Sequence, residues 1–191
     1  MRIFRLFNLL LAVGVMGVLT ACCSVSNEPS IITVKGGQFM RDGKPYYFVG
    51  TNFWYGAILG SEGEGGNRER LVKELDFMKA NGIDNLRILI GGEGENGLLG
   101  KIEPNLQSEP GVYNDAVLEG LDFLMMELGK RNMTAVLYFN NAWEWSGGYT
   151  QYVAWANNTP VLVPRVDGWF SYNTFAGEFV RNERAKQIFY D

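Results

Sequence analysis

The sequence contains no histidine, and this absence removes several classes of active site at once. A Ser-His-Asp triad, a histidine general base and a histidine-rich metal site all need an imidazole, whose charge changes near neutral pH. Acid–base chemistry must therefore come from carboxylates, lysine or tyrosine. The 191 residues are otherwise of globular composition, with 47% hydrophobic, 20% charged and 14% aromatic residues, which is typical of one domain.

Cysteine is almost as scarce. The two cysteines, Cys22 and Cys23, are adjacent, so no disulfide can join separated parts of the fold. They end an apolar run over residues 6–21, which follows Arg2 and Arg5. The run is shorter than the roughly 20 residues that a membrane-spanning helix needs, so the pattern is typical of an export signal.

The apolar run ends in Leu19-Thr20-Ala21-Cys22, which resembles the bacterial lipobox, where cleavage precedes lipidation of the cysteine. We therefore expect a signal peptide over residues 1–21, lipidation at Cys22 and a polar tether over residues 22–30. The protein would be an exported lipoprotein on a bacterial membrane, periplasmic or at the cell surface. An ordinary secretory signal, giving a secreted protein, and an uncleaved anchor are the alternatives.

Positive charge is also in short supply. Loss of Arg2 and Arg5 with the signal peptide removes two positive charges and changes the formal charge from −4 to −6. An acidic exported chain without a basic stripe is a poor candidate for binding nucleic acid.

Apolar runs and turn residues predict a short antiparallel hairpin followed by a first core strand. The hairpin covers residues 31–34 and 38–40, and Asp42-Gly43 forms the turn into a core strand over residues 46–49.

Two amphipathic helices alternate with two further strands. The first helix covers residues 68–81 after a capping Asn67, and the second follows a capping Asn114 and ends at Asn132. Their apolar stripes consist of Leu71, Leu75 and Met78 in the first and of Val117, Leu121, Leu124 and Leu128 in the second. Strands follow over residues 86–90 and 133–139. This β/α alternation predicts a parallel sheet or barrel.

The long connections follow the strands, whereas the links from helix to strand are short. In a (β/α)₈ barrel the loops after the strands build the active site. We therefore predict an α/β fold, a (β/α)₈ TIM barrel that is incomplete in this chain, with a hairpin and about the first three β/α units over residues 31–191. A full barrel needs about 250 residues, and an open α/β fold is the alternative. Residues 149–172 are predicted to be a third long loop, with a helix beginning near Asn173 or Asn182.

Arg87 interrupts the apolar strand over residues 86–90. An unpaired buried charge is very costly, so we expect this guanidinium to meet a carboxylate or a ligand. Its place near the carboxyl end of the strand favours a functional role inside the barrel. A structural salt bridge within the core is the alternative.

Aromatic and amide side chains gather in the loops after the strands. Trp54 and Trp143 each follow a core strand and can stack on pyranose rings, while Asn52, Asn140 and Asn141 offer hydrogen-bonding amides beside them. Packing within the loops is the alternative for both tryptophans. Less specific aromatic signals come from Trp145, Tyr149, Trp155 and Trp169.

Three glutamates in the same loops are weaker candidates. Retaining glycosidases need two carboxylates about 5 Å apart. Glu93, Glu95 and Glu144 follow the second and third strands, but nothing in the sequence pairs them. Glutamates in glycine-rich loops are usually solvated, so we expect none of the three to be catalytic.

Three motifs follow the predicted strands in order: Phe48-Val49-Gly50-Thr51-Asn52-Phe53-Trp54-Tyr55, Leu86-Arg87-Ile88-Leu89, and Asn140-Asn141-Ala142-Trp143 with Gly147-Gly148 after it. With them, residues 31–191 resemble the N-terminal part of an endo-β-1,4-mannanase of glycoside hydrolase family 5. The resemblance implies a (β/α)₈ barrel that hydrolyses mannan, glucomannan or galactomannan polysaccharides or oligosaccharides. The implied mechanism is a retaining double displacement without a metal or other cofactor.

The resemblance also implies roles for individual residues. Arg87 matches the second-strand arginine that hydrogen-bonds the nucleophile and keeps it ionised. Trp54 matches the first-strand aromatic that contacts substrate, but many members have Tyr-Trp where this chain has Trp54-Tyr55, so either ring is a candidate. The third-strand segment that borders the glycone subsites corresponds to Asn140, Asn141 and Trp143.

Both catalytic glutamates of the family are expected beyond Asp191. The acid/base follows an asparagine at the end of the fourth strand, and the nucleophile ends the seventh. The Asn-Glu pairs present, Asn27-Glu28 and Asn182-Glu183, follow no predicted strand. We therefore expect the 191-residue chain alone to be inactive on mannan. The alternatives are another family 5 β-glycanase, such as a cellulase, and a non-catalytic glycan-binding lipoprotein.

Overall fold

The computed structural model describes residues 31–191. The expected signal peptide, lipidation site Cys22 and tether all lie outside the described residues. The following account concerns the compact unit Ile32–Asp191. Within the described residues, no helix is both long and apolar enough to span a membrane.

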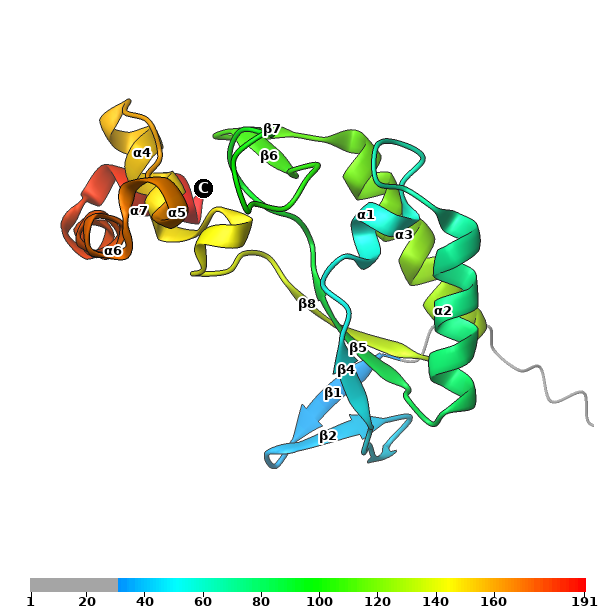
Figure 1. Ribbon diagram of the computed structural model, residues 1–191. Coiled ribbons are helices and arrows are strands. Elements are labelled where there is room, and N and C mark those ends of the chain that lie inside the picture. Colours follow the sequence, from blue (N-terminus) through cyan, green and yellow to red (C-terminus); the bar gives the residue numbers. More distant parts are fainter. Residues whose placement is uncertain (1–30) are drawn as a thin grey trace, which may run out of the picture. The chain divides into compact units, whose positions relative to one another are not determined.

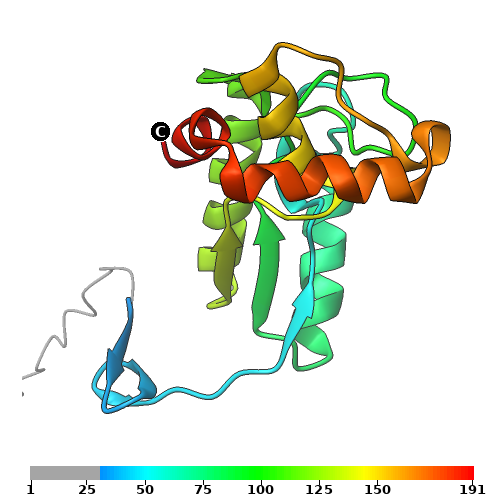
Figure 2. The ribbon, with the colours of Figure 1, turned by 90° about the vertical axis from the view of Figure 1, so that its left-hand side faces the viewer.

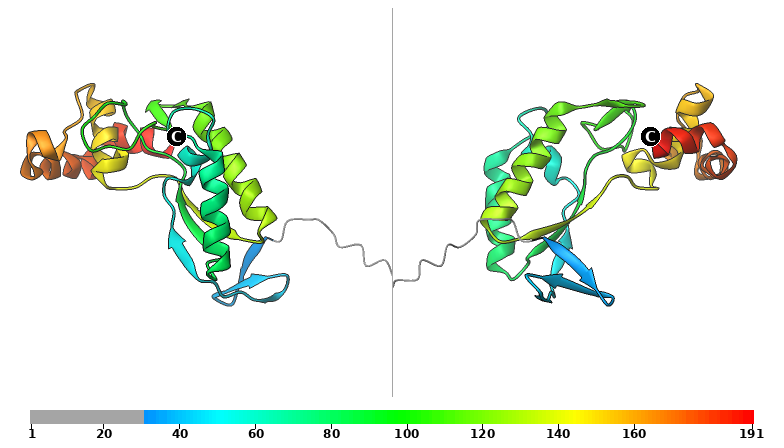
Figure 3. Two further views of the ribbon diagram at one scale, coloured as in Figure 1. Left: turned by 45° about the vertical axis from the view of Figure 1, so that its right-hand side comes forward. Right: turned by 180° about the vertical axis from the view of Figure 1, so that it is seen from behind.

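The unit begins with the predicted hairpin, extended by a short third strand. Asp42 and Gly43 have φ angles of 51° and 74° and form the predicted Asp-Gly turn. Beyond it, the Tyr46 hydroxyl is hydrogen-bonded to the Thr134 hydroxyl at 2.7 Å, which ties the hairpin to the central sheet. Figure 3 shows the hairpin at the end of the sheet where the parallel strands begin. Its antiparallel strands are β1 (Ile32–Lys35), β2 (Gln38–Arg41) and β3 (Lys44–Pro45).

The central sheet has three parallel strands in the order β4-β5-β8. Asn52 pairs with Arg87, and Arg87 pairs with Val136, so the carboxyl ends of the strands meet at one edge. The predicted β/α alternation is therefore confirmed. The strands are β4 (Gly50–Asn52), β5 (Asn85–Leu89) and β8 (Thr134–Tyr138).

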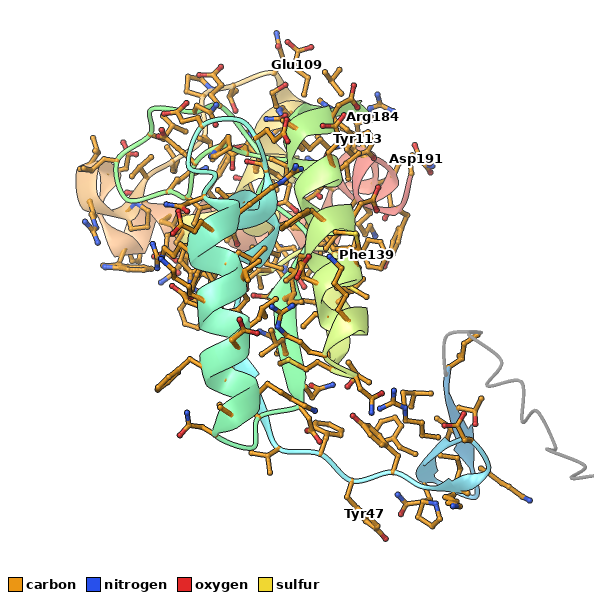
Figure 4. The ribbon with its side chains drawn as sticks, turned by 90° about the vertical axis from the view of Figure 1, so that its right-hand side faces the viewer. Tyr47, Glu109, Tyr113, Phe139, Arg184 and Asp191 are labelled. Atoms are coloured by element: carbon orange, nitrogen blue, oxygen red, sulfur yellow. The ribbon has the colours of Figure 1, made fainter. Side chains whose placement is uncertain are left out.

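The first core strand was predicted four residues too early, over residues 46–49. The backbone of this run joins the sheet only at Val49, whose carbonyl accepts hydrogen bonds from the backbone N–H groups of Asp84 and Asn85. The side chains of Tyr47 and Val49 are 77% and 63% exposed, and Tyr47 points away from the sheet (Figure 4). The apolar run over residues 46–49 therefore links the hairpin to the sheet and is not itself a core strand.

Three helices cover one face of the sheet (Figure 1). They are α1 (Gly56–Gly60), α2 (Arg68–Ala80) and α3 (Asp115–Lys130). The predicted caps are present: the Asn67 side chain accepts from Arg70 N at 2.9 Å, and the Asn114 side chain accepts from Ala116 N at 3.1 Å. The core consists of Phe53, Leu59, Leu71, Leu75, Met78, Leu86, Ile88, Leu124, Leu128 and Met133.

Helices α1 and α3 touch through their backbones at a pair of glycines. A Cβ atom on Gly60 would lie 2.3 Å from the carbonyl oxygen of Gly120, and a Cβ on Gly120 would lie 2.1 Å from that of Ala57. Real side chains do not tolerate such distances, so only glycine permits this approach. The short helix that follows the first strand-end loop is thereby seated directly on α3.

The long connection after β5 contains part of a second small hairpin. Its strands are β6 (Gln107–Glu109) and β7 (Val112–Tyr113).

The prediction of a third long loop over residues 149–172 is wrong, because this part of the chain is largely helical. Tyr152, Phe179 and Phe189 pack together in a second core, with ring centroids 5.1 Å apart for Tyr152 and Phe189. Figure 2 shows these helices beyond the carboxyl ends of the parallel strands. The elements are η1 (Glu144–Ser146), α4 (Gly148–Asn157), α5 (Pro164–Asp167), α6 (Trp169–Gly177), η2 (Glu178–Arg181) and α7 (Glu183–Tyr190).

The helix predicted to begin near Asn182 is confirmed as α7. The Asn182 side chain accepts from Ala185 N at 3.0 Å and so caps its first turn. The other predicted start, Asn173, lies inside α6.

Candidate functional site

The candidate site lies at the carboxyl edge of the central sheet. The three parallel strands end there, and the loops after β4, β5 and β8 carry most of the residues singled out from the sequence. In α/β sheets this edge is where ligands bind, because the loops that follow parallel strands converge on it.

Arg87 and Asn52 lie side by side on the face of the sheet opposite the helices. They are register partners, and Arg87 Nη1 donates to Asn52 Oδ1 at 3.4 Å. The guanidinium carbon lies 3.7 Å from the ring centroid of Tyr138, which holds it by a cation–π contact. A guanidinium fixed in this way can donate hydrogen bonds to a carboxylate or hydroxyl oxygen.

The expected burial of Arg87 is wrong, because the side chain is exposed. Its register partners Asn52 and Val136 are exposed too, so nothing within residues 31–191 covers this face at that level. The alternative of a core salt bridge is also not found: Arg87 takes part in none of the ion pairs in the described part of the chain.

Trp54 and Tyr55 are adjacent but face different surroundings. The Tyr55 hydroxyl donates to Glu74 Oε2 at 2.8 Å, and its ring packs 4.5 Å from that of Phe53. Burial, together with the hydrogen bond to Glu74, raises the pKa of Tyr55. The Trp54 side chain is instead 38% exposed and meets Trp145 edge to face at 5.4 Å. Of the two rings, Trp54 is the one available to a ligand.

The segment after β8 turns Trp143 outwards. The Asn141 side chain accepts from Trp143 N at 3.2 Å, a local turn that leaves Trp143 62% exposed. Asn140 is half-buried and lines a pocket, where its side chain lies against Tyr152. The two amides therefore differ, since Asn141 shapes the backbone whereas Asn140 borders the pocket.

Glu93, in the loop after β5, is buried, so the expectation of a solvated glutamate is wrong for this residue. It is 4% exposed, and its two carboxylate oxygens accept from the Tyr152 hydroxyl at 3.1 Å and Gly148 N at 3.4 Å. Burial raises the pKa of Glu93 to about 7, against the opposing effects of these two hydrogen bonds and of Lys101. A carboxyl group in this state can hold or release a proton near neutral pH.

Lys101 completes a charged cluster around Glu93. Burial lowers the pKa of Lys101 to about 8, while Glu93, Glu144 and Glu95 oppose that shift. Its ammonium group donates to Gln151 Oε1 at 3.2 Å. Oε2 of Glu144 is buried and has no hydrogen-bond partner among the described residues, whereas Glu95 is exposed as expected. This cluster could not be predicted, because Gln151 and Tyr152 come from a helix that was predicted as a loop.

A pocket of about 570 Å³ opens beside Glu93 and Asn140. Figure 4 shows Tyr113, Arg184 and Asp191 at the same end of the molecule, with Phe139 at the end of β8. The side chains around the pocket that can form hydrogen bonds or stack include Glu93, Tyr113, Phe139, Asn140, Tyr152 and Arg184.

The less specific aromatic candidates mostly belong to the second core. Tyr149 stacks on Phe179 at 4.5 Å, and Trp155 meets Tyr152 edge to face at 5.4 Å. Trp169 packs against Tyr172, whereas Trp145 meets Trp54 at the sheet edge. Within residues 31–191, no group of three or more Cys, Asp or Glu side chains is arranged to hold a metal ion.

Comparisons with known proteins identify the family to which this architecture belongs. Residues 29–191 match a family model described as GH family 5 beta-mannosidase-like. Mannan endo-1,4-beta-mannosidase 5 of Solanum lycopersicum is 27% identical over 97% of this chain and 42% of its own length. Mannan endo-1,4-beta-mannosidase 7 of Arabidopsis thaliana is 28% identical over 79% of this chain and 33% of its own length.

Solved structures support the same family. The glycoside hydrolase family 5 mannosidase from Rhizomucor miehei in complex with mannosyl-fructose is 34% identical, with a TM-score of 0.77, over 83% of this chain and 40% of that chain. The endo-1,4-beta-mannanase of the same organism, at 23% identity and a TM-score of 0.53, shares the fold. The hairpin and the three β/α units are thus part of a (β/α)₈ barrel, as predicted, and the chain spans about two fifths of the length of the first relatives.

Proposed function

Because this chain belongs to the β-mannosidase-like group of glycoside hydrolase family 5, we propose that it forms the substrate-binding side of an enzyme that hydrolyses β-1,4-mannosidic linkages. The substrate class is mannan, glucomannan or galactomannan. The mechanism is a retaining double displacement, in which a glycosyl-enzyme intermediate forms on one carboxylate and is hydrolysed with the help of a second.

The observation that carries this proposal is the pairing of Arg87 with Asn52 at the carboxyl edge of the sheet, beside the exposed ring of Trp54. A guanidinium there can donate to an ionised nucleophile and keep its pKa low. The Trp54 and Trp143 rings can bury the C–H faces of two sugar units, while Asn52 and Asn140 donate to and accept from their hydroxyls.

We further propose that the 191-residue chain alone binds mannooligosaccharides without cleaving them. Family resemblance assigns the acid/base and nucleophile glutamates to the fourth and seventh strands of the barrel, whereas the described residues contain three parallel strands. Glycan binding by this chain could then be measured separately from hydrolysis.

Isothermal titration of the purified chain with mannotetraose tests the binding proposal, with cellotetraose as the matched ligand. We expect the mannose oligomer to bind more tightly and the Trp143→Ala variant to lose about 1–3 kcal/mol of binding free energy, as for removal of a stacking aromatic. Trp169→Ala is the control, because that ring is 51% exposed but lies on α6. Unchanged binding by Trp143→Ala would contradict the assigned site.

A second candidate function is exo-acting β-mannosidase activity. It is favoured by the identity to the mannosidase that was solved with mannosyl-fructose, 34%, against 23% for the endo-1,4-beta-mannanase of the same organism. Titration with mannobiose and mannohexaose distinguishes the two, because an endo-acting site spans several sugar units on both sides of the cleaved bond. Equal affinities for mannobiose and mannohexaose would favour the exo-acting site. Tighter binding of cellotetraose than of mannotetraose would instead favour a β-glucanase.

We also propose that the protein is exported and anchored by a lipid on Cys22, based on the apolar run and the Leu19-Thr20-Ala21-Cys22 motif. Metabolic labelling with an alkyne fatty acid in a bacterial host tests this. Label should be incorporated by the native chain and lost in Cys22→Ser.

A further inference from the structure

Glu93 joins the loop after β5 to the segment that follows Trp143. Its backbone N–H donates to Ser146 O at 3.0 Å, and its carboxylate accepts from Gly148 N and from the Tyr152 hydroxyl. One buried residue thus holds the turn before α4 through its backbone N–H and the first turns of that helix through its carboxylate.

The turn that faces Glu93 has no room for a side chain at Gly147. Gly147 has a φ of +104°, and a Cβ atom there would lie 2.5 Å from Glu93 Oε2. The segment is also held by the hydrogen bond from Ile102 N to Trp145 O at 2.8 Å. The loop after β5 therefore holds the segment 144–148 through Glu93 and Ile102.

Trp143 itself has little support of its own. It is 62% exposed, and its backbone N–H is held by the neighbouring Asn141 side chain. Its carbonyl accepts from Ser146 N and from the Ser146 hydroxyl, both at 3.4 Å, so the segment 144–148 holds the carboxyl side of Trp143, as Asn141 holds its amino side.

We propose that Glu93 is a positioning residue for glycan binding, which holds Trp143 in place by fixing the segment 144–148 through Gly148 and Tyr152. This inference rests on the proposed function, because it assigns Trp143 to a sugar-binding surface. Glu93 touches no sugar in this scheme and acts through the backbone of the following segment.

A double-mutant cycle tests the inference by titration with mannotetraose. Glu93→Ala removes both hydrogen-bond acceptors, and we expect affinity to fall about tenfold, since two buried hydrogen bonds are lost. In a Trp143→Ala background the same change should alter affinity by less than about twofold, because the ring that Glu93 positions is absent. A general structural defect would lower affinity in both backgrounds, and that result would overturn the proposal.

Conservative variants separate the hydrogen bonds from the charge. Glu93→Gln keeps both partners, because its amide oxygen can accept from Gly148 N and its amide N–H can donate to the Tyr152 hydroxyl oxygen, so it should restore binding. Tyr152→Phe removes one partner and should lower affinity about threefold, which keeps the test open if Glu93→Ala does not fold. Glu95→Ala is the control, because Glu95 is exposed in the same loop. Equal losses in the Gln and Ala variants would overturn the role assigned here.

Hydrogen exchange provides a readout that does not depend on any glycan. Amides in residues 143–149 should exchange faster in Glu93→Ala or Tyr152→Phe than in the unmodified chain, while those of α2 should be unchanged. Unaltered exchange in residues 143–149 would overturn the inference and leave the proposed function standing. Failure of the unmodified chain to bind mannotetraose would instead remove the proposed function and this inference with it.

Discussion

Replacing Glu93 with glutamine should remove a pH dependence of folding stability that the buried carboxyl group creates. Burial raises the pKa of Glu93 from 4.5 to about 7. The folded state therefore binds this proton more tightly than the unfolded state does. The stabilising contribution is fully present below pH 4.5 and is lost as the pH rises to about 7.

The size of the effect follows from the shift in pKa. Each pKa unit corresponds to about 1.36 kcal/mol, so the rise from 4.5 to about 7 gives about 3 kcal/mol. This is a large fraction of the roughly 5–15 kcal/mol by which a domain is usually stable. Lys101 acts over a different range: its pKa is lowered to about 8 from 10.5, so its contribution is present above pH 10.5 and lost as the pH falls to 8.

Urea unfolding at pH 4.5, 5.5, 6.5 and 7.5 measures the effect as the difference between the unmodified chain and Glu93→Gln. Relative to the variant, the unmodified chain should lose about 3 kcal/mol of unfolding free energy across this range. Lys101 and Tyr152 act on Glu93 directly, Tyr113 and Arg184 line the pocket beside it, and Glu144 acts on Lys101; all five remain in both proteins. For Glu95→Gln, the difference in unfolding free energy from the unmodified chain should not change with pH. The same pH-independent difference for Glu93→Gln would refute the reasoning.

Two further predictions concern packing and the exposed arginine. Gly120→Ala should lower the free energy of unfolding by about 1–3 kcal/mol, because its Cβ would lie 2.1 Å from Ala57 O. Gly129→Ala in the same helix, with open space around its Cβ, should instead raise the free energy of unfolding by about 0.5–1 kcal/mol. Urea unfolding measures both changes. Arg87→Gln should change the same quantity by less than about 1 kcal/mol, since the side chain is exposed and stacked on Tyr138, and a loss above about 3 kcal/mol would point to a structural role.

The helices α2 and α3 could be predicted because their signals are local. An asparagine cap, an apolar stripe at helical spacing and a stop signal lie within each segment, and the structure places Asn67 and Asn114 as caps. The barrel assignment followed from the order of these elements and from the position of the long loops after strands.

Helices α4 to α6 could not be predicted because their packing is not local. The aromatic residues that bury them pair across distant positions, as Tyr149 does with Phe179, and α6 has no single apolar stripe. One signal was present: Asn158 ends α4 in the left-handed conformation, shortly before Pro160.

The burial of Glu93 could not be read from its own neighbourhood either. Glycines surround it in the sequence, and its partners Gly148 and Tyr152 lie 55 and 59 residues further along the chain. By contrast, the positions of Trp54, Trp143 and Arg87 at the carboxyl edge of the sheet could be predicted, because each lies in a strand or in the loop after one whose end was approximately located.

The glycine contact between α1 and α3 has a consequence for chimeric enzymes. Because Gly60 and Gly120 fit each other without side chains, the two helices form one unit for recombination, although 60 positions separate them. A crossover between relatives within residues 61–119 would take the two surfaces from different parents. Unless both parents carry glycine at both positions, Trp54, which lies just before α1, would be displaced, so family shuffling should place its breakpoints outside this interval.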